Sequence, residues 1–135
     1  MLICAVLAFA SLSASQSAWG ARSATGREAT RIHRLVLPAC NADQRQLAHG
    51  KPCRAIHRPK VSTVDPRYAF AYVTGEGWSG ELVKRTTPHS TRWRIVAISG
   101  NGVNSCSYWA SRSSIRVVVD LHLLGERGYC TLTGN

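Results

Sequence analysis

The side chains with which this sequence could perform general acid–base chemistry are His57, His89, Glu81, Arg85 and Arg94. RNA cleavage needs a general base, a general acid and a cation beside the phosphate. Glu81 and Arg85 lie four residues apart, so they share one face of a strand. We favour a simpler interpretation, in which Glu81 and Arg85 form an exposed ion pair and His89 is a solvated loop residue. We therefore assign no catalytic residue and keep a small secreted hydrolase, such as a ribonuclease, as the alternative function.

Cofactor and metal chemistry find no support in the sequence. It lacks G-x-S-x-G, a phosphate-binding glycine loop, H-E-x-x-H and C-x-x-C. The histidines, which include His33, His49 and His122, are scattered without ligand spacing, and the cysteines are too far apart for a zinc site. We predict neither a cofactor nor a metal.

The cysteines predict disulfide bonds. Cys40, Cys53, Cys106 and Cys130 follow the apolar N-terminal segment, and an even count in a small exported chain is typical of two bridges. Three connectivities are open. We favour Cys40–Cys53 with Cys106–Cys130, because sequential pairing closes short loops.

Residues 1–20 have the pattern of a signal peptide. They carry no charge, their apolar core is too short to cross a bilayer comfortably, and small residues at Ala18 and Gly20 place cleavage after Gly20, with Ser17 or Ala18 as alternatives. No Lys or Arg precedes the apolar run, so either the true start lies upstream or the amino terminus alone supplies the positive charge. The sequence predicts a secreted protein whose mature chain has no transmembrane segment.

The mature chain keeps the full net charge of +10. Such a charge favours anionic partners, among them nucleic acids, anionic glycans, teichoic acids and anionic lipid surfaces. We interpret residues 21–38 as a flexible basic leader, whose arginines are the ones best placed to touch a polyanion: Arg22, Arg27, Arg31 and Arg34. The simpler interpretation is a solvated tail.

Aromatic and basic residues also occur together further along the chain. Aromatic and arginine side chains are enriched at interfaces and in stacking platforms, although in a small domain they often belong to the core. The residues of this candidate patch are Tyr68, Tyr72, Trp78, Arg85, Arg92, Trp93 and Arg94.

Three β-like runs organise the domain. Residues 61–73, 78–86 and 92–99 alternate in character and are joined by short turns, which favours an antiparallel meander. Large residues alternate with small ones over 68–73, and this indicates that a helix packs closely against the face with the small residues or against the opposite face; periodicity alone does not decide which.

Two helices are expected around this sheet. Residues 41–49 form a candidate helix, with Asn41 as N-cap and Gly50 after its end. Residues 111–124 have both β propensity and helical spacing, and we favour a helix capped by Ser113 or Ser114. The expected fold is a single α+β domain over 39–130, with three or four curled antiparallel strands, a helix on one face, two disulfides and a tail over 131–135.

Some of these segments resemble a set of short exported proteins of high-GC Gram-positive bacteria. The resemblance rests on Val61-Ser-Thr-Val-Asp-Pro-Arg-Tyr-Ala, on Arg92-Trp-Arg-Ile-Val and on a cysteine-containing C-terminal helix. It implies this fold and export, and it implies no activity.

We conclude that the sequence indicates a non-enzymatic secreted or cell-surface-associated domain that binds an anionic polymer or a cell-surface component. A protease inhibitor would need a rigid exposed loop, for which residues 100–105 are the candidate segment.

Overall fold

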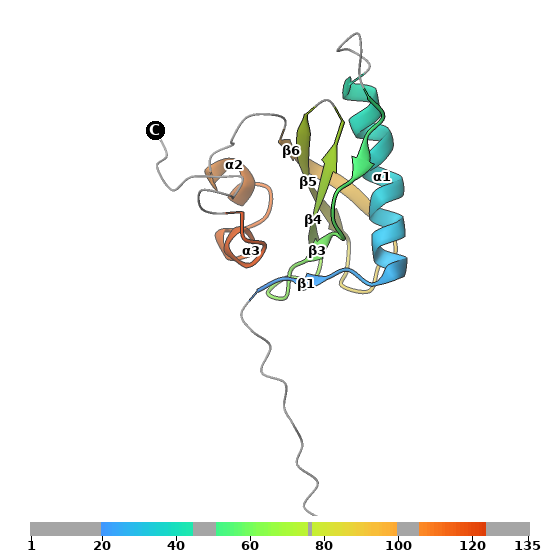
Figure 1. Cartoon of the computed structure of the whole chain (residues 1–135). Coiled ribbons are helices and arrows are strands. Elements are labelled where there is room, and N and C mark those ends of the chain that lie inside the picture. Colours follow the sequence, from blue (N-terminus) through green and yellow to red (C-terminus); the bar gives the residue numbers. More distant parts are fainter. Residues whose placement is uncertain (1–19, 45–50, 76, 100–105, 124–135) are drawn as a thin grey trace, which may run out of the picture.

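The computed structural model describes residues 20–44, 51–75, 77–99 and 106–123, and its fold is α+β, as predicted (Figure 1). The strands are β1 (Arg22–Ser23), β2 (Arg54–Ala55), β3 (Lys60–Val61), β4 (Tyr68–Thr74), β5 (Trp78–Arg85) and β6 (Trp93–Ser99). The helices are α1 (Gly26–Gln44), α2 (Cys106–Ala110) and α3 (Ile115–Asp120). Apart from Gly20, the predicted signal peptide lies outside the described residues, as do loop 100–105 and tail 131–135.

Within the described residues, the sheet is antiparallel and has six strands, in place of the predicted three or four. The predicted meander is confirmed as β4, β5 and β6, but its first run, 61–73, is divided: Val61 belongs to β3, which pairs antiparallel with β4. The additional strands are two residues long, which is too short to leave an alternating pattern in the sequence. β1 pairs with β3, and both β2 and β3 pair with β4.

Helix α1 covers one face of the sheet (Figure 1). The small side chains of Ala69, Ala71 and Val73 on β4 are fully buried in the core beneath this helix, together with Ile32 and Val36 of α1. Small residues allow the helix to approach closely. The alternation over 68–73 left open which face the helix covers, and in the structure α1 covers the small one.

The opposite face is covered as well, by α2 and α3 (Figure 1). There Tyr68, Phe70 and Leu82 pack in one buried cluster with Trp109 of α2 and Val117 of α3. The prediction of a helix on one face is therefore incomplete. The large residues of β4 are apolar and need their own cover from water.

The prediction of a flexible leader over 21–38 is wrong, because most of it belongs to α1. Thr25 and Glu28 form a capping box, in which the Thr25 amide donates to the Glu28 carboxylate at 2.9 Å and the Glu28 amide donates to the Thr25 hydroxyl at 3.3 Å. Ile32 and Val36 then supply apolar contacts at helical spacing. Both signals are local in the sequence, but the high arginine content of this segment led to its interpretation as a solvated leader.

The predicted helix over 41–49 is also wrong at its start. Asn41 lies inside α1 and caps no helix; its side-chain oxygen accepts a hydrogen bond from the Cys53 amide at 2.7 Å. Residues 45–50 lie outside the described part of the chain.

The C-terminal helix is confirmed in type but is shorter than 111–124. Helix α3 begins after Ser114, whose hydroxyl accepts a hydrogen bond from the Val117 amide at 3.3 Å. Its buried face contains Val117 and Val118, whereas Ile115 and Val119 are each 51% exposed. Helix α2 precedes it and was not predicted.

The Cys40–Cys53 disulfide is confirmed, with both residues buried in the core beneath α1. It ties α1 to the chain just before β2. Cys106 is buried and disulfide-bonded, and its predicted partner Cys130 lies outside the described residues.

Candidate functional site

Helix α1 presents a row of arginines to solvent. Arg27, Arg31 and Arg34 are exposed, and their spacing of four and three residues places them on one side of the helix. Ile32 and Val36 occupy the side that faces the sheet. We call Arg27, Arg31 and Arg34 the α1 arginine row. Among the described residues, none of the three has an ion-pair partner.

Acidic groups do little to neutralise this surface. Glu28 and Asp65 are each engaged by arginine side chains, and Glu81 and Asp120 are buried. Within the described ranges, only Asp43 has an exposed carboxylate outside an ion pair. The outward-facing charge of the described domain is therefore predominantly positive.

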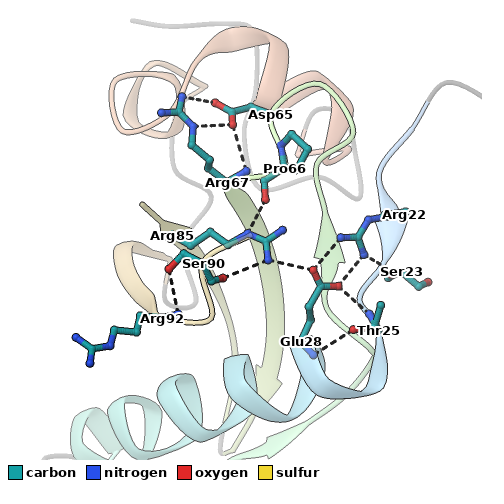
Figure 2. Close-up of polar contacts among 10 residues, drawn as sticks. All are labelled: Arg22, Ser23, Thr25, Glu28, Asp65, Pro66, Arg67, Arg85, Ser90 and Arg92. Atoms are coloured by element: carbon teal, nitrogen blue, oxygen red, sulfur yellow. Dashed lines mark hydrogen bonds and ion pairs between the residues drawn. The ribbon is translucent and has the colours of Figure 1, made fainter. Parts of the chain in front are cut away.

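Glu28 organises a polar cluster at the start of α1 (Figure 2). Arg22 binds its carboxylate in a bidentate manner, with N–O distances of 2.7 and 2.8 Å, and Arg85 lies at 3.2 Å. The Arg22 hydrogen bonds, together with the Thr25 amide and the charge of Arg85, lower the pKa of Glu28 to about 2. The cluster fixes the N-terminal end of the helix that carries the arginine row.

Arg85 reaches beyond this carboxylate to two backbone segments (Figure 2). Its Nε donates to the Pro66 carbonyl oxygen at 3.0 Å, and Nη1 donates to that of Ser90 at 3.4 Å. Its guanidinium carbon lies 4.5 Å from the centre of the Trp93 ring. Since its side chain is only 7% exposed, Arg85 joins elements of the fold and offers little surface to a ligand.

The prediction of an exposed Glu81–Arg85 ion pair is wrong. Both residues are buried, and Arg85 pairs with Glu28. Glu81 is 1% exposed on the α1 face of β5, and its Oε2 has no hydrogen-bond partner in the part of the chain that the structure describes. Burial raises the pKa of Glu81 to about 8, and the charge of Asp43 acts in the same direction.

The predicted aromatic–basic patch does not form one surface. Tyr68 is buried in the core beneath α2 and α3, and Tyr72 packs against the same core. Arg85 and Trp93 belong to the α1 face instead. Of the remaining members, Arg92 and Arg94 are exposed, and Arg94 lies opposite Lys84 in the register of β5 and β6. The Trp78 side chain lies outside the described part.

The residues considered for a ribonuclease are separated too. His57 and His89 are exposed, with the His57 ring centre 6.2 Å from that of Tyr72. Glu81 lies beneath α1, and Arg94 is exposed on β6. The described structure therefore gives these groups no common, accessible site.

Comparisons with protein-family models, with curated proteins and with solved structures found no match to this chain. A search of the described helices for one with the length and apolar character of a membrane span found none. The geometry of the domain is therefore the basis for proposing a function.

Proposed function

We propose that this protein is an exported, non-enzymatic domain that binds a phosphate-bearing anionic polymer through the α1 arginine row. The observation that carries the proposal is the exposure of Arg27, Arg31 and Arg34 along one side of one helix, in a domain whose acidic groups are mostly paired or buried. Guanidinium groups bind phosphate oxygens in a bidentate manner, which favours arginine at such sites.

The attachment of α1 supports this assignment. The Cys40–Cys53 disulfide and the contacts of Arg85 with Glu28 hold the helix near both of its ends. A fixed helix keeps the guanidinium groups in register, so binding costs less ordering entropy than it would for a flexible tail. The net charge of +10 adds long-range attraction.

The shared chemistry of the ligand is a chain of phosphodiesters. An exported protein meets it in glycerol-phosphate polymers of the cell surface and in nucleic acid outside the cell. A poly(glycerol phosphate) chain and a short single-stranded RNA of matched charge are therefore the two probes. Preference for the first assigns a cell-surface ligand, and preference for the second assigns a nucleic acid.

The first test removes the arginine row. We expect R27Q/R31Q/R34Q to weaken binding of the preferred probe by about tenfold or more and to reduce the slope of log affinity against log salt by about 2–3. Each phosphate contact that is lost reduces the number of counterions released on binding, and the affinity therefore depends less steeply on salt. Fluorescence anisotropy over a series of salt concentrations measures both quantities.

The matched control is R54Q/R94Q/R116Q, which removes the same charge from exposed residues of β2, β6 and α3. An equal loss in both triple variants would mean that diffuse charge, and not the α1 arginine row, attracts the polymer. Absence of measurable binding to either probe would refute the proposal, and cleavage of the RNA probe would favour the ribonuclease alternative.

Export and a second disulfide are part of the same proposal. Disulfides persist in oxidising compartments, so the Cys40–Cys53 bridge supports secretion, and the buried, disulfide-bonded Cys106 supports pairing with Cys130. The likeness of residues 61–130 to short exported bacterial proteins also remains a proposal.

Intact mass of the protein from culture medium, with and without reduction and alkylation, tests export and pairing together. We expect a chain that begins at Ala21 and has no free thiol. A cell-retained chain with free thiols would contradict both.

A further inference from the structure

We propose that Glu81 makes the docking of α1 on the sheet proton-dependent, so that the α1 arginine row binds its polymer most tightly while Glu81 is protonated. The second half of this inference rests on the function proposed above, whereas the first half concerns the fold alone. Helix α1 packs with one side against the sheet face that holds Glu81 and carries the arginine row on the other side. One helix thus connects a buried carboxyl group with the proposed binding surface.

The surroundings of Glu81 suit the neutral acid. The side chain is 1% exposed, and its strand neighbour on the same face, Val83, and the opposite residue on β4, Ala71, are fully buried and apolar. Among the described residues, Oε2 has no hydrogen-bond partner. A carboxylate in such a place lacks the hydrogen bonds and counter-charge that its ionised form needs. Movement of α1 away from the sheet would admit water and relieve this cost.

No cation in the described residues compensates for the charge of Glu81. The negative charge of Asp43 on α1 repels an ionised Glu81 and therefore raises its pKa. The residues opposite it on β4 and β6 are Ala71 and Ile98, which carry no charge. On its own strand, Arg85 is engaged with the Glu28 carboxylate, and Lys84 lies on the opposite face, with its Nζ 5.0 Å from the centre of the Tyr68 ring. Every charged group that faces Glu81 or shares its strand thus either disfavours ionisation or is occupied elsewhere.

The direction of the effect follows from the two forms of the protein. Burial, assisted by Asp43, raises the pKa of Glu81 from 4.5 to about 8 when α1 is docked. When α1 is displaced, water restores the ordinary value. Docking is therefore most stable below about pH 4.5, weakens as the pH rises, and levels off above about pH 8, where the docked form is ionised too.

Polymer binding and protonation then support each other. A displaced α1 would have to be ordered again before Arg27, Arg31 and Arg34 could bind in register, which lowers the affinity. By reciprocity, a polymer that binds the docked helix raises its affinity for the proton.

Hydrogen exchange of the α1 amides tests the first half without any polymer. We expect their protection factors in the wild-type protein to fall by up to about tenfold per pH unit between about pH 5 and about pH 8. In E81Q, which keeps the shape of the side chain without its charge, the protection should stay nearly constant. The variant retains His33, the titratable group on α1 whose pKa burial lowers, so the difference isolates Glu81. Equal slopes in both proteins would overturn the inference.

A second variant keeps the test valid if E81Q does not fold. D43N removes the repelling charge of Asp43, so the levelling-off of α1 protection should move to lower pH. If α1 protection does not change with pH in the wild-type protein and D43N gives the same result, the docking of α1 does not depend on protonation of Glu81.

The polymer arm separates this inference from the proposed function. Added polymer should raise α1 protection in the wild type, most strongly near about pH 8, and should do so less in R27Q/R31Q/R34Q. If the polymer has no effect on either protein while the pH slope persists, the binding proposal fails and the proton-dependent docking stands. If the slope itself is absent, the inference fails whatever the polymer does.

Discussion

Replacing Arg85 with methionine should lower the free energy of unfolding by about 3–5 kcal/mol. The substitution removes a 3.2 Å ion pair with Glu28 and leaves the carbonyl oxygens of Pro66 and Ser90 without this donor. Because the side chain is 7% exposed, water replaces these interactions poorly. Methionine keeps apolar contact with Trp93, so the loss reports the polar interactions. Urea unfolding followed by circular dichroism measures it.

Arg22→Met is the matched control for this prediction. Arg22 binds the same carboxylate, but its side chain is 41% exposed, so water screens and replaces the interaction. We expect a cost of at most about 1 kcal/mol. If the two variants were equally destabilised, burial of Arg85 would not be the reason for its effect.

The second large effect concerns the opposite face of the sheet. Trp109→Ala should cost about 3–5 kcal/mol, because the indole is fully buried and its removal leaves a cavity between α2 and the sheet. The Trp109 ring centre lies 5.5 Å from that of Phe70 and 5.2 Å from that of Tyr108, both in edge-to-face geometry. These ring contacts add to the apolar burial. Thermal and urea unfolding measure the loss.

Val119→Ala is the control on the neighbouring helix. Val119 is 51% exposed on α3, so its truncation should change stability by no more than about 0.5 kcal/mol. A Trp109→Ala variant as stable as Val119→Ala would mean that α2 and α3 contribute little to the fold. The sheet beneath α1 would then be the stable unit.

These two residues stabilise different layers of the domain. Arg85 links β5 to the start of α1 and therefore supports the arginine row, whereas Trp109 attaches the C-terminal helices to the other face. We expect Trp109→Ala to leave polymer binding largely intact where the protein remains folded. Arg85→Met should reduce stability and helix order together.

Several features could be predicted from the sequence because their signals are local. The alternation over 68–73 identified β4 and the packing of a helix against the sheet, but it left open which face the helix covers. Ser114 was one of the two candidate helix caps, and the short loop between Cys40 and Cys53 favoured their bridge. Each of these signals depends on residues that are close in the sequence.

Helix α1 was missed although its signals are also local. The Thr25–Glu28 capping box and the spacing of Ile32 and Val36 are visible in the sequence, but the arginines between them suggested a solvated leader. The same arginines form the exposed side of an amphipathic helix. The predicted leader ended at Pro38, which lies within α1.

By itself the sequence determined the meander and the basic character, since period-two alternation and composition need no tertiary contact, and it favoured the Cys40–Cys53 bridge among three connectivities. Only the tertiary structure decided where the charges act. Glu81 and Arg85 share one strand, yet Arg85 pairs with Glu28 while Glu81 is buried in the apolar core beneath α1. Whether a carboxyl group is paired, buried or exposed depends on which distant element packs against it, and within the described residues that packing leaves the α1 arginine row without an ion-pair partner.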